Sequence, residues 1–169
     1  MNIRKLNEEF YEEFQREITL IEQNVNADYS LKIRLKPTSE QGIYINLPLI
    51  KEKANYLQSN YGIAQPPKDC DAIIVDLDSR TIYLIEMKKS TSSSTSQDIK
   101  KQLEAGLCWW KHLAFCMNNT FEFEIKKLAV YVQENRSRQR KKRSRDIAAE
   151  SQQGFHKMIG SSISLQYLD

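Results

Sequence analysis

The chain has 169 residues, of which 40% are hydrophobic and 28% are charged; this composition is typical of one globular domain and not of a disordered chain. Its apolar runs are far shorter than the ~20 residues of a membrane-spanning helix, and its N-terminus turns acidic where a secretion signal would need an apolar stretch. We therefore expect a cytoplasmic protein that does not enter a membrane. Three cysteines and two histidines show no zinc-ligand spacing, which favours free, mostly buried thiols over a structural zinc site.

The first third of the chain is predicted to open with a helix. Apolar side chains recur in steps of three and four from Ile3 to Val25, the pattern of an amphipathic helix with one buried stripe. On that helix Glu17 falls inside the stripe and Glu13 at its margin, where a carboxylate needs a partner, a metal ion or a route to solvent. Three shorter elements are expected next: strands over 29–35 and 43–47, and a helical insertion over 51–60.

The centre of the chain predicts an antiparallel hairpin. Two β-branched apolar runs, Asp71–Leu77 and Thr81–Lys88, flank the turn dipeptide Asp78-Ser79. With a loop of two or four residues, this register places Asp71 opposite Glu86. Opposed side chains on paired strands lie ~4.5–5.5 Å apart and like charges there repel. The pair therefore needs a shared proton, neutralisation by Lys88, or a divalent cation such as Mg²⁺.

The second half is predicted to contain one long helix and two strands. Thr95 and Asp98 form a helix-capping pattern, and an apolar stripe follows as far as Met117. Residues 121–132 alternate and then become fully apolar, as in an inner strand, and 163–168 suit a final edge strand. This order predicts an α/β fold in which helices flank one central mixed sheet.

One segment concentrates the positive charge. The net charge is +3, but Arg136–Arg145 contains seven basic residues and no acid, which leaves the rest of the chain at 3 − 7 = −4. We expect this run to bind nucleic-acid phosphates without reading sequence; the alternatives are a solvated loop or a nuclear localisation signal. The residues concerned are Arg136, Arg138, Arg140, Lys141, Lys142, Arg143 and Arg145.

The hairpin and the helix after it resemble the PD-(D/E)xK nuclease superfamily. The likeness consists of Pro67-Lys-Asp-Cys-Asp71, Tyr83-Leu-Ile-Glu86-Met-Lys88 and the helix over 98–117. It implies an αβββαβ restriction-endonuclease-like core and an endonuclease that hydrolyses DNA with Mg²⁺, for which Mn²⁺ can substitute. The resemblance makes Asp71, Glu86 and the Met87 carbonyl metal ligands, and makes Lys88 the residue that orients the attacking water. The products would carry a 5′-phosphate and a 3′-hydroxyl.

The resemblance also suggests further residues and leaves alternatives open. Many members supply an acid from the first helix, which implies Glu17 or Glu13 as an additional ligand. Gln102 matches half of a Gln-x-x-x-Tyr submotif, because Gly106 stands in the tyrosine position, and it is a candidate DNA contact or a solvated side chain. Cutting both strands of a duplex would call for a homodimer. The other functions considered are a non-catalytic nucleic-acid-binding module, for DNA or RNA, and an interaction subunit of a DNA-processing complex.

Overall fold

The computed structural model describes residues 3–22, 29–53, 68–89, 95–118, 122–132 and 154–168. Two helices and nine strands lie within these ranges, together with short 3-10 turns at both ends. The helices are α1 (Leu47–Lys53) and α2 (Ser96–Cys116). The strands are β1 (Tyr11–Gln15), β2 (Glu17–Ile21), β3 (Ser30–Arg34), β4 (Gln41–Ile45), β5 (Ala72–Asp76), β6 (Thr81–Lys88), β7 (Glu124–Tyr131), β8 (His156–Ile159) and β9 (Ser162–Ser164).

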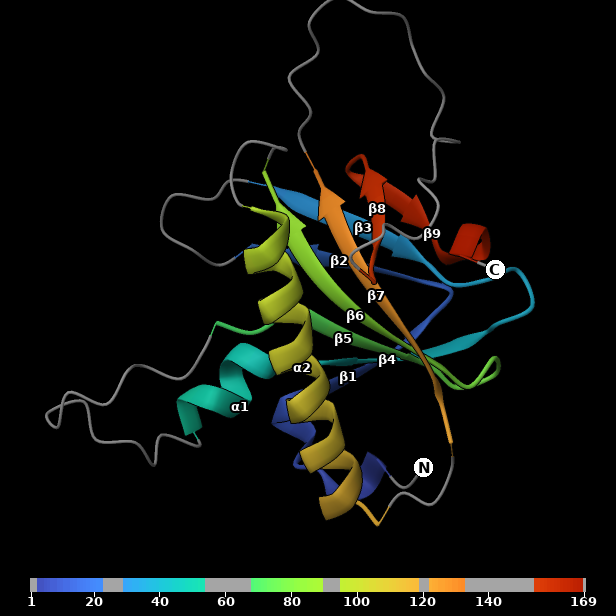
Figure 1. The fold of residues 1–169 in the computed structure, drawn as a ribbon. Coiled ribbons are helices and arrows are strands. Elements are labelled where there is room, and N and C mark those ends of the chain that lie inside the picture. Colours follow the sequence, from blue (N-terminus) through green and yellow to red (C-terminus); the bar gives the residue numbers. More distant parts are fainter. Residues whose placement is uncertain are drawn as a thin grey trace, which may run out of the picture.

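A mixed sheet of six strands forms the centre of the fold. Its order is β1-β4-β5-β6-β7-β8. The pairs β1–β4, β4–β5 and β5–β6 are antiparallel, and the pairs β6–β7 and β7–β8 are parallel. Both helices lie on one face, and a second sheet of order β2-β3-β9 lies on the other (Figure 1). The α/β class and the mixed sheet are confirmed, but both helices of the described residues lie on the same face.

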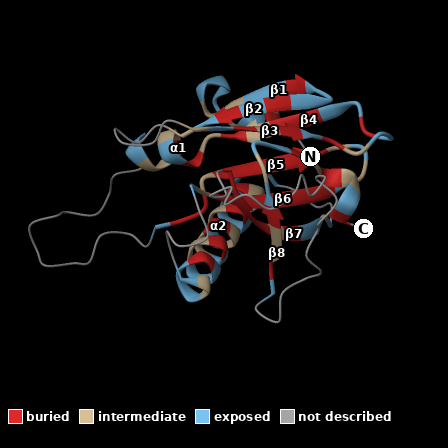
Figure 2. Cartoon of the chain, turned by 90° about the horizontal axis from the view of Figure 1, so that it is seen from above, coloured by how far each residue is buried: buried red, intermediate tan, exposed pale blue. Residues whose placement is uncertain are grey.

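Side-chain alternation on β5 and β6 explains why both faces are covered. Ile73 and Leu84 point into a core shared with α2, whereas Ile74 and Tyr83 point into a core shared with the second sheet. All five residues of β5 and seven of the eight residues of β6 are buried (Figure 2). An unbroken apolar run is expected of strands with two covered faces.

The predicted N-terminal helix is wrong. The segment forms β1 and β2, which belong to different sheets because β1 pairs with β4 and β2 pairs with β3. Arg16 separates them with a φ of 58°, a left-handed conformation that breaks the strand. The step of four from Phe14 to Ile18 suits a helix, but four is also a multiple of the strand period of two.

The other predicted elements agree more closely with the structure. The helix after Thr95 and the inner strand β7 are confirmed, and Thr95 forms a capping box with Asp98. Helix α1 begins before the expected insertion, and 54–60 lies outside the described residues. The final strand is shorter than expected, since β9 gives way to a 3-10 turn over Leu165–Leu168. Among the described helices, none has the length and hydropathy needed to cross a membrane.

Candidate active site

The β5–β6 hairpin brings Asp71 to Glu86, as the sequence predicts. Val75 pairs with Ile82 and Ala72 with Ile85, so the next position in the same register joins Asp71 to Glu86. The turn between the strands has four residues, Leu77–Arg80. Asp71 extends the ladder through its side chain, because its Oδ2 accepts a hydrogen bond of 2.6 Å from the Met87 amide. The two carboxylates are therefore held at one end of the buried hairpin.

Glu86 is fully buried, with a relative exposure of 0%. Its Oε1 accepts a hydrogen bond from the Lys88 ammonium, and that lysine side chain is 17% exposed. Its Oε2 is buried and has no hydrogen-bond partner among the described residues. A buried carboxylate oxygen without a hydrogen bond is destabilising, and the described residues satisfy only one of the two oxygens of Glu86.

The pKa values of both acids are raised. Burial, and then the negative charge of Asp71, raise the pKa of Glu86 from 4.5 to about 8, against the opposing effect of Lys88. Burial also raises the pKa of Asp71 from 3.8 to about 6, although the Met87 amide lowers it. Two neighbouring carboxylates with raised pKa values bind a proton or a cation, because ionising both would place two negative charges side by side.

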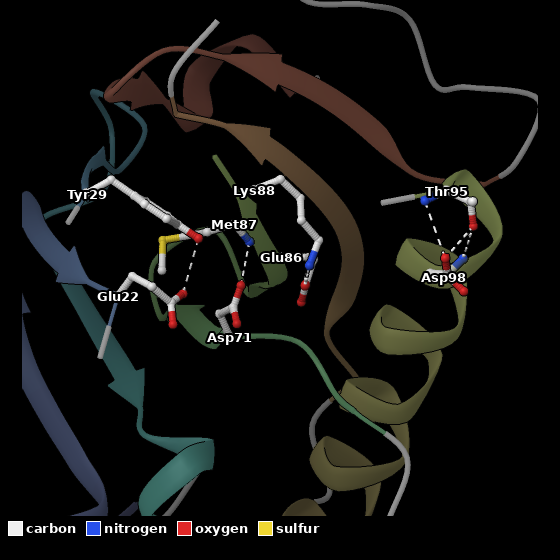
Figure 3. A network of polar contacts seen from close by, with 8 residues as sticks. All are labelled: Glu22, Tyr29, Asp71, Glu86, Met87, Lys88, Thr95 and Asp98. Atoms are coloured by element: carbon white, nitrogen blue, oxygen red, sulfur yellow. Dashed lines mark hydrogen bonds and ion pairs between the residues drawn. The ribbon is translucent and has the colours of Figure 1, made fainter. Parts of the chain in front are cut away.

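A cavity of about 530 Å³ opens onto these residues. Glu22, which follows β2, and Tyr29, which precedes β3, line it on one side, and Asp71, Glu86 and Lys88 of the hairpin line it on another (Figure 3). Side chains of α1 and α2 complete the wall of the cavity. Its volume is in the range of small-molecule and cofactor pockets. The raised pKa values and the cavity therefore occur at the same place, which makes this the candidate active site.

Glu22 is the acid that the sequence prediction missed. It follows β2 and lines the cavity, and the Tyr29 hydroxyl donates a hydrogen bond of 3.4 Å to its Oε2 (Figure 3). Its negative charge contributes to the raised pKa values of Asp71 and Glu86. The alternation of Ile18 and Leu20 indicates a strand that leads to Glu22, whereas the predicted helix placed Glu17 and Glu13 near the site.

Glu17 and Glu13, the predicted ligands from the first helix, do not join the site. Glu17 lies on β2 and forms ion pairs with Lys32 at 2.6 Å and Arg34 at 3.0 Å. The hydrogen bonds from Lys32 and Arg34 lower the pKa of Glu17. Glu13 is exposed on β1, and neither glutamate lines the cavity. Their predicted role depended on the helix that the structure replaces with strands.

Other residues of the cavity wall were foreseen only in part. Gln102 is half-buried on α2 and lines the cavity, so it lies beside the acids and not on an open surface. The wall also holds Asp69, which accepts a hydrogen bond of 2.8 Å from Lys51 and whose second oxygen, Oδ2, has no partner among the described residues. The basic run over 136–145 lies outside the described residues.

The donor atoms at the site suit a hard divalent cation. Mg²⁺ binds through one or two carboxylates and completes its shell with waters and phosphate oxygens. Asp71 and Glu86 supply the carboxylates, and the buried Glu86 Oε2 is an acceptor that lacks a protein partner within the described ranges. No set of three or more His, Cys, Asp or Glu side chains gathers into a metal site in the described part of the chain. The residues present therefore fit a two-carboxylate site and not a metal cage made of side chains alone.

No protein-family model, no curated protein and no solved structure matches this chain. The case for a function therefore depends on the geometry and chemistry of the site itself.

Proposed function

We propose that the chain is a metal-dependent endonuclease of the PD-(D/E)xK type, with a restriction-endonuclease-like core, that hydrolyses phosphodiester bonds in DNA. Asp71 and Glu86 hold Mg²⁺ together with the backbone carbonyl of Met87, and Lys88 orients the attacking water. One observation carries the proposal: two acids with raised pKa values meet at the end of a buried hairpin, with a lysine two residues beyond, at the edge of a cavity.

The buried pair has a chemical use that fits this set of residues. A stable core would not need two carboxylates opposite each other on paired strands, because a buried charge without a partner destabilises the fold. A bound Mg²⁺ would polarise the scissile phosphate and lower the pKa of a water. Asp71 and Glu86 would fix the position of the metal ion, and the hydrogen bond from the Met87 amide orients the Asp71 carboxylate.

Lys88 supplies the positioning group for the nucleophile. Its ammonium contacts Glu86 Oε1 and remains partly exposed at the cavity. An ammonium in this position can hold a water by hydrogen bonding and offset negative charge on the phosphate. The same ammonium group is the counterion of Glu86 in the metal-free protein.

The charges around the cavity also favour a phosphate-bearing substrate. Its lining contains equal numbers of acidic and basic side chains, so a divalent cation would make it positive. The acids are Glu22, Asp69, Asp71 and Glu86, and the lysines are Lys51, Lys68, Lys88 and Lys89. A locally positive cavity raises the concentration of an anionic substrate near the site.

Cleavage of a supercoiled plasmid by the purified chain tests the proposal. We expect nicking or linearisation with Mg²⁺ or Mn²⁺, none in EDTA, and a loss of at least ~10²-fold for Asp71→Asn, the scale of a lost transition-state interaction. Glu17→Gln is the matched control, because this acid lies outside the cavity, and it should cut like the wild type. Salt-sensitive DNA binding with no cleavage in either metal would instead identify a non-catalytic binding module.

A further inference from the structure

The outer face of α2 presents soft metal ligands to solvent. Cys108, His112 and Cys116 recur every four residues in the C-terminal half of the helix, and all three are exposed. Side chains at this spacing lie on one helical face. This corrects the prediction of mostly buried thiols, since only Cys70 is buried. The same half of α2 also exposes Phe115, which is 81% accessible and is the most exposed large apolar side chain of the described residues.

His112 and Cys116 have the separation that one zinc ion requires. The Cys116 Sγ lies 3.7 Å from the His112 Nε2. With Zn–S near ~2.3 Å and Zn–N near ~2.0–2.1 Å, a tetrahedral angle at the metal places the two ligand atoms about 3.6 Å apart. The Trp109 and His112 rings form a T-shaped pair, with centroids 6.2 Å apart and planes at 79°. Two ligands can therefore meet one ion without a change in backbone or helix register.

Two ligands are half of a tetrahedral zinc site. Within the described ranges, no third His, Cys, Asp or Glu side chain gathers with this pair. A two-fold axis beside the helix would bring the same pair from another molecule to the same ion, because an isologous interface repeats every contact. Helices pack with their axes ~8–10 Å apart, a spacing that side chains of this length can bridge through a metal ion.

We propose that His112 and Cys116 on the outer face of α2 form half of a zinc site, which a second copy of this chain completes as a Cys₂His₂ centre. Phe115 precedes Cys116 and lies on the same exposed side of α2, so the dimer would cover an apolar ring that water otherwise contacts. The thiol of each Cys116 gives up its proton when it binds the metal. This inference does not depend on the proposed hydrolysis, because the ligands lie outside the cavity.

Sedimentation of the full chain with a non-thiol reductant tests the proposal. We expect the monomer mass of 19.8 kDa in EDTA and twice that mass with Zn²⁺, at one metal ion per two chains. Co²⁺ in place of Zn²⁺ should give the intense absorption of a tetrahedral thiolate complex. His112→Ala and Cys116→Ser should abolish both signals. Cys108→Ser is the matched control, since Cys108 is exposed one turn before His112, and it should retain them.

Four results would overturn the proposal. They are one zinc per chain on a monomer, a dimer that persists in EDTA, no binding of Zn²⁺ or Co²⁺ at all, and loss of the dimer in Cys108→Ser but not in Cys116→Ser. The substituted side chains are exposed, so circular dichroism should show unchanged folding in each variant. Because these readouts are mass and metal stoichiometry, a failure here is distinguishable from a failure of DNA cleavage.

Discussion

Stability of the metal-free protein should fall as the pH rises, because Glu86 is a buried acid. Its pKa is raised from 4.5 to about 8 in the folded chain, so between these values the folded state holds a proton that the unfolded state has lost. The unfolded state then binds fewer protons, and the free energy of unfolding decreases with pH. The stability that protonated Glu86 contributes is fully present below pH 4.5 and is lost as the pH rises through about 8.

The size of this effect follows from the change in pKa. At 1.36 kcal/mol for each pH unit, the rise from 4.5 to about 8 sets an upper limit of about 5 kcal/mol. Asp71, whose pKa rises from 3.8 to about 6, has the same sign, but the two acids share one repulsion and their contributions do not add. A loss of ~2–5 kcal/mol is a large part of the ~5–15 kcal/mol that a domain usually has.

Urea unfolding in EDTA between pH 5 and pH 9 measures this loss. Glu86→Gln removes the titrating group, so its stability should change much less over the same range. Glu104→Gln is the matched control: Glu104 is an exposed acid on α2 paired with Lys127 at 2.6 Å, and its substitution should leave the slope intact. Saturating Mg²⁺ should restore stability at pH 9, by about 2.7 kcal/mol at a hundred times its Kd. Stability that is flat or rises over this range in the wild type would refute the reasoning.

Three further predictions test the surroundings of the site. Glu22→Gln removes a charge that raises the pKa of Glu86, so the pKa of Glu86 in the folded protein should fall and the total loss of stability between pH 5 and pH 9 should be smaller in the same urea series; an unchanged loss would count against Glu22 as part of the site. Thr95→Ala removes the side chain that accepts a hydrogen bond from the Asp98 amide at 3.2 Å, and thermal unfolding should show a loss of ~0.5–2 kcal/mol; no loss would mean that the cap is not formed. Gly106→Ala places a Cβ 2.2 Å from the Cys70 Sγ, which should destabilise the domain by ~1–3 kcal/mol despite the better helix propensity of alanine, and Cys70→Ala in the same chain should recover part of it; additive losses would contradict the proposed clash.

The hairpin and α2 could be predicted because each has a strong local signal. A turn dipeptide between two β-branched runs fixes the register, and that register alone places Asp71 opposite Glu86. Thr95 and Asp98 define the start of α2 in the same local way. These elements carry Glu86, Lys88 and Gln102 and place Asp71 directly before β5, so the candidate site apart from Glu22 largely followed from the sequence.

The N-terminal region could not be predicted from periodicity. The steps of four from Phe10 to Ile18 are allowed by both the helix and the strand period. The structure adopts strands, and Arg16, with its left-handed backbone, lies where the chain passes from one sheet to the other. The alternation over 29–35 predicts β3, but the helix predicted for the preceding segment hides its partner β2, so the pairing of the second sheet was not predicted. Glu22 was missed for that reason, since only the second sheet brings it to the cavity.

Single-turnover cleavage of a plasmid by Lys88→Ala at saturating Mg²⁺ tests the central claim most directly. We predict that the rate falls by ~10²–10⁴-fold, as for loss of a group that positions or activates the nucleophile. DNA binding should be retained, and Lys32→Ala, which removes a half-buried lysine paired with Glu17 outside the cavity, should keep the wild-type rate. A Lys88→Ala protein that cuts at the wild-type rate, or a wild-type protein that cuts equally well in EDTA, would contradict the account.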